Sequence, residues 1–308
     1  MDDSDDRTAS LMTPAKLAQV SRPRAPASPA AWLDQMAADA GHQHLQRLAQ
    51  LRGELQAQAG RRGLEPLSQA LEQLGAALPQ LDFTLLKPRG WWARTTGKSR
   101  SAGAEFTAQY ERIEQAIRAL TAQIQGLQKK QAGDAGALDR ALVEFEVEFR
   151  AVDKIIDQGA RWLQDMRNQL KARLAEATDP QSQQQVKDDA ARCEILVVRL
   201  KSLRAAVTAA QQVHQQALAA AARRAALFQM LQQALSTDVK SWQVKLSALA
   251  AAAGEDRAAA LTLEAPTQTH RELQLFVTQA LADCAQLHAQ EQAAARTLDA
   301  LGESLGTA

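Results

Sequence analysis

The sequence predicts an all-α protein, an elongated antiparallel bundle of long coiled-coil-like helices. Alanine and leucine dominate the apolar residues and aromatic residues make up only 4% of the chain, so helix formers outnumber strand formers. Apolar residues recur at alternating spacings of three and four, the pattern of helices packed along one seam. Long stretches lack helix breakers, and none occurs from Gln181 to Ala253.

Charge and cysteine content exclude several classes of protein. The formal net charge is +1, so no overall field attracts nucleic acid, and we expect no nucleic-acid partner. Two cysteines are too few for a disulfide framework, and no secretory leader or membrane-spanning run of apolar residues is visible. We therefore expect a cytoplasmic protein, with peripheral contact at the inner membrane left open.

The chain begins with a segment that has almost nothing apolar to bury. Residues 1–29 contain a cluster of aspartates followed by four prolines, which predicts a disordered acidic and proline-rich tail. A helical pattern starts at Ala30 and continues to Gly60, and a short helix is expected over about Leu67–Leu78. From these patterns we predict a single elongated helical domain over residues 30–308.

A basic loop that contains two tryptophans is predicted over residues 84–103. Its core carries five positive charges, no acidic residue and an adjacent tryptophan pair. Such a loop suits a lipid headgroup interface or an anionic partner. Alternatively, the two indoles plug the end of the bundle, because exposed tryptophan pairs are costly. The candidate binding residues are Lys87, Arg89, Trp91, Trp92, Arg94, Lys98 and Arg100.

Four long helical segments follow the loop. One seam runs from Phe106 to Leu127, with Gly133 and Gly136 expected to end its helix, and the next runs from Leu138 to Leu174. Residues 144–149 alternate as a strand would, but the heptad continues on both sides, which favours helix. The interval 181–253 is one helix or two, because the spacing slips around residues 236–238. A last helix is predicted from Leu273 to Leu301.

Pairs of potential metal ligands do not form a convincing site. His42 and His44 are two residues apart, so on a helix they point in different directions. Cys284 and His288 have ligand spacing, but Cys284 lies on the apolar seam and no second pair accompanies it. We interpret the lone seam residue His214 as structural.

Carboxylates also fail to indicate a catalytic centre. Glu144 and Glu148 share a helix face, yet their helix lacks the histidine that carboxylate-bound di-metal bundles require. The sequence contains no nucleotide-binding, zinc-protease or hydrolase motif. We therefore predict no enzyme activity, no cofactor, no metal and no small-molecule substrate.

From about Leu81 to Leu249 the chain resembles the toxic-anion resistance family, known as the tellurite-resistance TelA or KlaA family. The resemblance lies in Leu81-Asp82-Phe83, in the helix start at residues 106–117 and in the block 235–243, with Phe106, Tyr110 and Trp242 as landmarks. The proline that precedes the family's tryptophan is absent. The resemblance implies an all-helical cytoplasmic protein linked to tellurite resistance or envelope stress, and it brings no catalytic residues.

Three functional hypotheses follow. The first is a non-enzymatic scaffold or adaptor in toxic-anion resistance, which acts through protein partners or at an anionic membrane surface. The second is a thiol-dependent protein that handles tellurite through Cys193 and Cys284, although both lie on seams. The third is a general coiled-coil interaction protein with no role in anion resistance.

Overall fold

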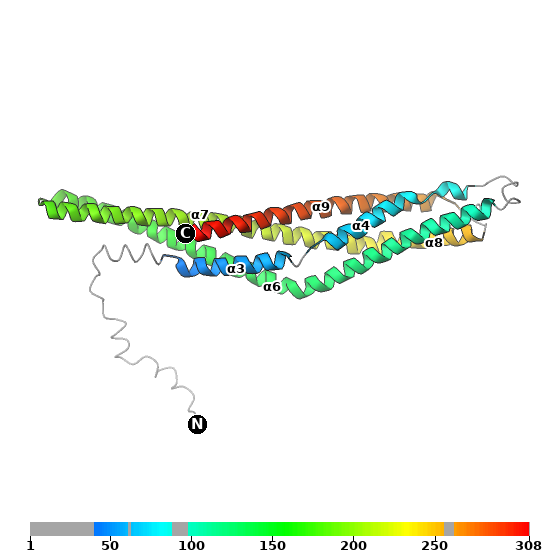
Figure 1. Ribbon diagram of the computed structural model, residues 1–308, viewed down its shortest axis with the longest axis horizontal. Helices are drawn as coiled ribbons and strands as arrows, with labels where there is room; N and C mark the ends of the chain where they lie inside the picture. The colour runs from blue at the N-terminus through cyan, green and yellow to red at the C-terminus, as the bar shows by residue number, and fades with distance from the viewer. Residues whose placement is uncertain (1–39, 61–62, 88–97, 256–261, 308) are drawn as a thin grey trace, which may run out of the picture. The chain divides into compact units, whose positions relative to one another are not determined.

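The computed structural model describes residues 40–60, 63–87, 98–255 and 262–307, and every element in these ranges is helical (Figure 1). The all-α fold class is thereby confirmed. The predicted tail over residues 1–29 lies outside the described residues. The elements are α3 (His42–Gly60), α4 (Glu65–Ala77), the 3-10 turns η2 (Leu78–Gln80) and η3 (Phe83–Leu86), α6 (Lys98–Glu176), α7 (Pro180–Ala234), the π-helix η4 (Leu235–Val239), α8 (Lys240–Gly254) and α9 (Glu264–Thr307).

The described chain groups into two compact units. Unit 1 contains Arg150–Val207 with the residues before Arg47, and unit 2 contains Arg47–Phe149 and Thr208–Thr307. Both α6 and α7 therefore contribute to each unit. The single domain proposed over residues 30–308 stays a prediction.

Unit 1 is built on the second part of α6 and the first part of α7. Their contact is close at Gly159, where a Cβ atom would stand 2.9 Å from a methyl carbon of Leu200. An ion pair of 2.8 Å joins Arg173 of α6 to the buried Asp189 of α7. These two segments of α6 and α7 therefore pack against each other.

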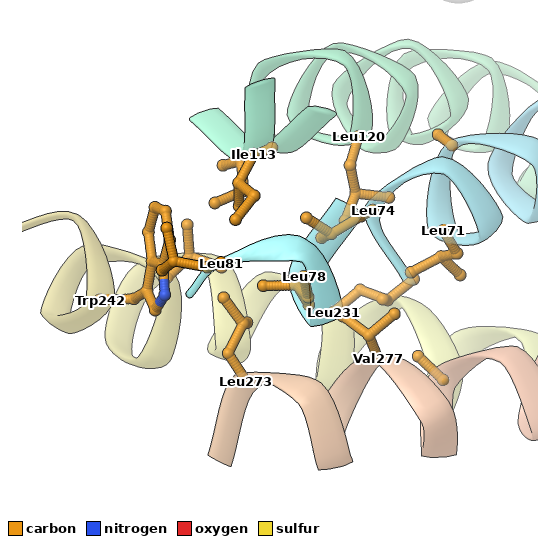
Figure 2. Close-up of a cluster of buried hydrophobic side chains, with 14 of the residues drawn as sticks. Leu71, Leu74, Leu78, Leu81, Ile113, Leu120, Leu231, Trp242, Leu273 and Val277 are labelled. Atoms are coloured by element: carbon orange, nitrogen blue, oxygen red, sulfur yellow. The ribbon is translucent and has the colours of Figure 1, made fainter. Parts of the chain in front are cut away.

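Unit 2 has the larger core, which α4, α8, α9 and the adjacent parts of α6 and α7 enclose. Figure 2 shows leucines of α4 and η2 pointing into the same cluster as side chains of α6, α8 and α9. Trp242, Phe106 and Ile113 are fully buried there. Helices with narrow apolar stripes are stable in this arrangement because each stripe faces several neighbours.

The predicted helix break at Gly133 and Gly136 is wrong, because α6 continues through both glycines to Glu176. An interior glycine costs only about 1 kcal/mol relative to alanine, and the packed seams on either side outweigh that cost. Residues 144–149 are helical, so the preference for helix over strand there is confirmed.

The predicted basic loop, residues 84–103, has helical residues at both of its ends. Residues 84–86 belong to η3, and residues 98–103 form the first turns of α6. Asp82 explains the first difference, because its carboxylate accepts a hydrogen bond of 2.8 Å from the backbone N–H of Thr84 and caps the 3-10 turn.

The slip in apolar spacing near residue 237 corresponds to a change in helix type. The turn Leu235–Val239 is a π-helix between α7 and α8. The hydroxyls of Ser236 and Thr237 both donate to the carbonyl of Gln233, at 2.8 Å each. These bonds provide donors for the carbonyl of Gln233 at the point where the α-helical hydrogen-bond pattern gives way to the π-helical one. The interval is therefore neither one uniform α-helix nor two separate helices.

Candidate functional site

The candidate binding residues of the basic loop fall partly outside the described chain. Lys87 is exposed and directly follows η3, whose last residue is Leu86. Positions 98 and 100 lie in the first turn of α6, where only the backbone is described. Arg89, Trp91, Trp92 and Arg94 lie outside the described residues. We call residues 87–100 the basic segment, and its two flanks form the part of the site whose geometry is known.

The flank before the basic segment is fixed to the start of α6. The backbone N–H of Asp82 donates to the side-chain oxygen of Gln109 at 2.9 Å. The ring of Phe83 contacts the ring of Phe106 edge-on, with 5.9 Å between centroids. Because one contact is polar and the other aromatic, this flank has both a defined register and a buried anchor.

The flank after the basic segment is fixed to α8. A Cβ atom at Gly103 would stand 2.2 Å from the carbonyl oxygen of Ala253, so the two backbones touch. One turn later the hydroxyl of Thr107 lies 3.3 Å from the carbonyl oxygen of Ala250. Only glycine permits the first contact, since any side chain would displace α8.

A buried histidine joins the elements that hold these flanks. The indole N–H of Trp242 donates to Nδ1 of His270 at 3.0 Å, and Nε2 of His270 donates to the carbonyl oxygen of Leu78, also at 3.0 Å. His270 is 4% exposed. Burial lowers its pKa, and the bond to Leu78 opposes that effect only in part. The ring is therefore neutral, with its proton on Nε2.

The three landmark residues meet around this histidine. Tyr110 stacks on Trp242, with centroids 5.4 Å apart and planes 16° apart. Phe83 contacts both Phe106 and His270 edge-on. Burial raises the pKa of the Tyr110 phenol. Aromatic residues from η3, α6, α8 and α9 thus form one aromatic cluster, consisting of Phe83, Phe106, Tyr110, Trp242 and His270.

Sequence analysis missed His270 and the role of Phe83. The signal for His270 was present, because it lies three residues before Leu273 and so extends the α9 seam by one position. A seam histidine opposite a seam tryptophan is a candidate for a buried hydrogen bond. The pairing itself depends on how α8 and α9 are aligned, which the local pattern does not contain.

A groove of about 370 Å³ is lined by residues of α6, of the π-helix and of the start of α8. Its rim includes the cationic side chains of Arg118 and Lys240, and its floor includes Ile117 and Val239. Arg118 is 70% exposed and paired with Glu114 at 2.9 Å. These two cations are well solvated, so the groove by itself holds an anion only weakly.

The other histidines and carboxylates of interest have ordinary structural roles. His42 contacts Gln46 on the same helix. His214 is mostly buried, lies 3.9 Å from Glu146 and packs on Phe149. The guanidinium of Arg47 lowers the pKa of the Glu144 carboxylate through a hydrogen bond of 2.6 Å. Among the residues whose side chains are described, no three His, Cys, Asp or Glu residues cluster as a metal site would.

Both cysteines are buried and unpaired thiols. Burial raises the pKa of Cys193, and it raises that of Cys284 to about 11. His288, four residues after Cys284, contacts Gln292 at 2.8 Å in an exposed position. A thiol with a raised pKa is a poor nucleophile because little thiolate is present at neutral pH.

None of the helices in the described parts of the chain is long and apolar enough to cross a membrane. A model of the toxic anion resistance protein (TelA) family matches residues 33–299. No curated protein and no solved structure matches the chain. The matched region includes both flanks of the basic segment and the whole aromatic cluster. The chain therefore belongs to the toxic anion resistance protein (TelA) family.

Proposed function

We propose that the protein acts in toxic-anion resistance as a non-enzymatic helical scaffold or adaptor, and that the basic segment is its contact surface. The observation that carries this proposal is that both flanks of the segment are anchored to the helices of unit 2. Gly103 and Thr107 hold the second flank against Ala253 and Ala250, while the bonds of His270 hold the first.

Anchored flanks favour a binding role, because less entropy is lost on binding when the elements beside the contact surface are already ordered. The composition of the segment indicates the chemistry of that partner. Five cationic side chains without an acidic one attract an anionic surface. Adjacent tryptophans suit the boundary between an apolar environment and water, because an indole has an apolar ring and a polar N–H group. The partner is an acidic protein surface or the anionic face of the inner membrane.

The thiol-dependent alternative has less support. Burial and the raised pKa of Cys284 both disfavour direct attack of a thiolate on tellurite. Replacing both cysteines with alanine should therefore leave resistance unchanged. Loss of resistance in a double variant that still folds would favour the thiol mechanism over the adaptor.

The growth test uses a strain that lacks the gene and carries plasmid-borne variants. Wild type should restore growth on tellurite, and Trp91→Ala/Trp92→Ala should not. The matched control is Lys129→Gln/Lys130→Gln, which removes two exposed charges on α6 away from the segment and should behave as wild type. Equal growth of the tryptophan variant and wild type would contradict the proposed role of the segment.

The source of the negative charge is tested by sedimentation with vesicles. Wild-type protein is mixed with phosphatidylcholine vesicles, with and without phosphatidylglycerol. Binding that requires phosphatidylglycerol and is lost in the tryptophan variant would support a membrane contact. Absence of binding would direct the search to a protein partner, which crosslinking from the segment in cells would capture.

A further inference from the structure

The ring of His270, on α9, forms hydrogen bonds both to α8 and to η2, the turn that precedes the basic segment. Its two ring nitrogens connect Trp242 of α8 to Leu78 of η2. The amide of Gln274 lies 3.2 Å from Nε2. The bonds to Trp242 and Leu78 use the full capacity of a neutral imidazole, which has one donor and one acceptor.

The arrangement allows only one protonation state. Nδ1 must accept the indole proton of Trp242, because an indole nitrogen cannot accept a hydrogen bond. A second proton on the ring would place two N–H groups against each other across 3.0 Å. It would also place a positive charge in a site that is 4% exposed.

Within the described residues, the causes that shift the pKa of His270 are burial and the bond to Leu78, with no charged neighbour among them. The titratable and charged groups on the elements around the ring include Lys245 of α8, which donates to Thr269, Tyr110 of α6, which stacks on Trp242, and Asp82, which caps η3. Neither Lys245 nor Tyr110 carries a carboxylate, and the carboxylate of Asp82 accepts a hydrogen bond from Thr84. On α9 itself Arg271 and Glu272 are exposed. No carboxylate bonds the ring among the described residues.

We propose that His270 is an acid-sensitive latch, and that its protonation releases residues 78–87 from α8 and α9 and thereby frees the first flank of the basic segment. The idea that this latch regulates the basic segment rests on the function proposed above. The release of residues 78–87 on protonation of His270 does not depend on that function. The turns η2 and η3 contain only seven residues, and the ring of His270 contacts two of them, Leu78 through a hydrogen bond and Phe83 edge-on.

The direction of the pH effect follows from where the proton binds more tightly. The closed state lowers the pKa of His270, whereas the released state gives it the ordinary value of about 6.5. The closed state is therefore fully stabilised above that pH and loses stability as the pH falls. Between pH 7.0 and 5.5 the opening equilibrium should rise by up to roughly eightfold.

Hydrogen exchange of the full-length wild-type protein tests the latch without any partner. Exchange is measured by mass spectrometry at pH 7.0 and 5.5 and divided by the intrinsic rates. Peptides that cover residues 78–87 should lose up to roughly eightfold protection at the lower pH, while peptides from residues 290–301 of α9 should not. Unchanged protection of residues 78–87 would overturn the proposal, whatever the growth test gives.

A pair of variants assigns the effect to this histidine. His270→Gln removes the titrating group, so protection of residues 78–87 should become independent of pH. His288→Gln, an exposed position on the same helix, should keep the wild-type response. Persistence of the pH effect in His270→Gln would overturn the assignment. If that variant fails to fold, 5-fluorotryptophan NMR of the wild type decides, because the Trp242 resonance must change with the same midpoint as the exchange.

Discussion

A Cβ atom on Gly103 of α6 would stand 2.2 Å from the carbonyl oxygen of Ala253 in α8. Real Cβ atoms do not approach an oxygen this closely, so the glycine is required by the contact rather than by backbone conformation. The hydroxyl of Thr107 reaches the carbonyl of Ala250 one turn further along. The two helices therefore have a fixed axial register at the start of α6.

Gly103→Ala should lower the free energy of unfolding by about 1–3 kcal/mol, because the added methyl group must push α8 away. The matched control is Gly126→Ala in the same helix, where nothing lies within 4 Å of the new atom. That change should be neutral or stabilise the protein by up to about 1 kcal/mol. Urea unfolding of both variants measures the difference. Equal stabilities would show that α6 does not depend on this contact.

Trp242→Phe should destabilise the protein by about 1–3 kcal/mol, because it leaves Nδ1 of the buried His270 without its donor. Tyr110→Phe is the control, since it keeps the stacked ring and should cost less than about 1 kcal/mol. Thermal unfolding of the two variants provides the comparison. A larger loss in the tyrosine variant would mean that the hydroxyl of Tyr110 contributes more to stability than the hydrogen bond between Trp242 and His270.

Glu291→Ala should be costly, because the side chain of Arg224 is only 7% exposed and Glu291 accepts from its Nε at 3.1 Å. Removing the carboxylate leaves a buried guanidinium unpaired, and we expect a loss of about 2 kcal/mol, reduced from the fully buried case because Glu291 is partly exposed. Arg118→Ala breaks the exposed pair with Glu114 and should cost less than about 0.5 kcal/mol. Denaturation midpoints that do not separate the two would refute this ranking.

Both thiols should resist modification in the folded protein. At pH 8 a thiol with a pKa of about 11, as for Cys284, is almost entirely protonated, and burial also blocks access. Reaction with Ellman's reagent should therefore be slow under native conditions and should release two equivalents in guanidinium. Fast release of one equivalent from native protein would identify an accessible thiol and revive the thiol-dependent mechanism.

The seams were predictable because they depend only on local spacing. Ile113 and Ile117 are buried as the heptad requires, and so are Val277 and Cys284. The helix break predicted at Gly133 and Gly136 was wrong, because the low helix propensity of two glycines costs less free energy than the packing of the flanking turns provides.

The aromatic cluster was predictable only in part. Phe106, Tyr110 and Trp242 were recognised individually through the family resemblance, but nothing local places Tyr110 against Trp242. Their stacking joins residues more than 130 positions apart. His270 was missed for the same reason, because its partner is on another helix.

The π-helix at Leu235–Val239 has a consequence for how the chain tolerates changes in length. In an undistorted α-helix Asp238 would follow Leu231 on the buried stripe, seven residues later, but the wider turn buries Val239 and exposes Asp238 instead. The π-helical turn thus accommodates one extra residue, and the apolar residues after it stay on the buried face of the helix. A relative of this chain that is one residue shorter between positions 236 and 238 would reach the same core through a plain α-helix.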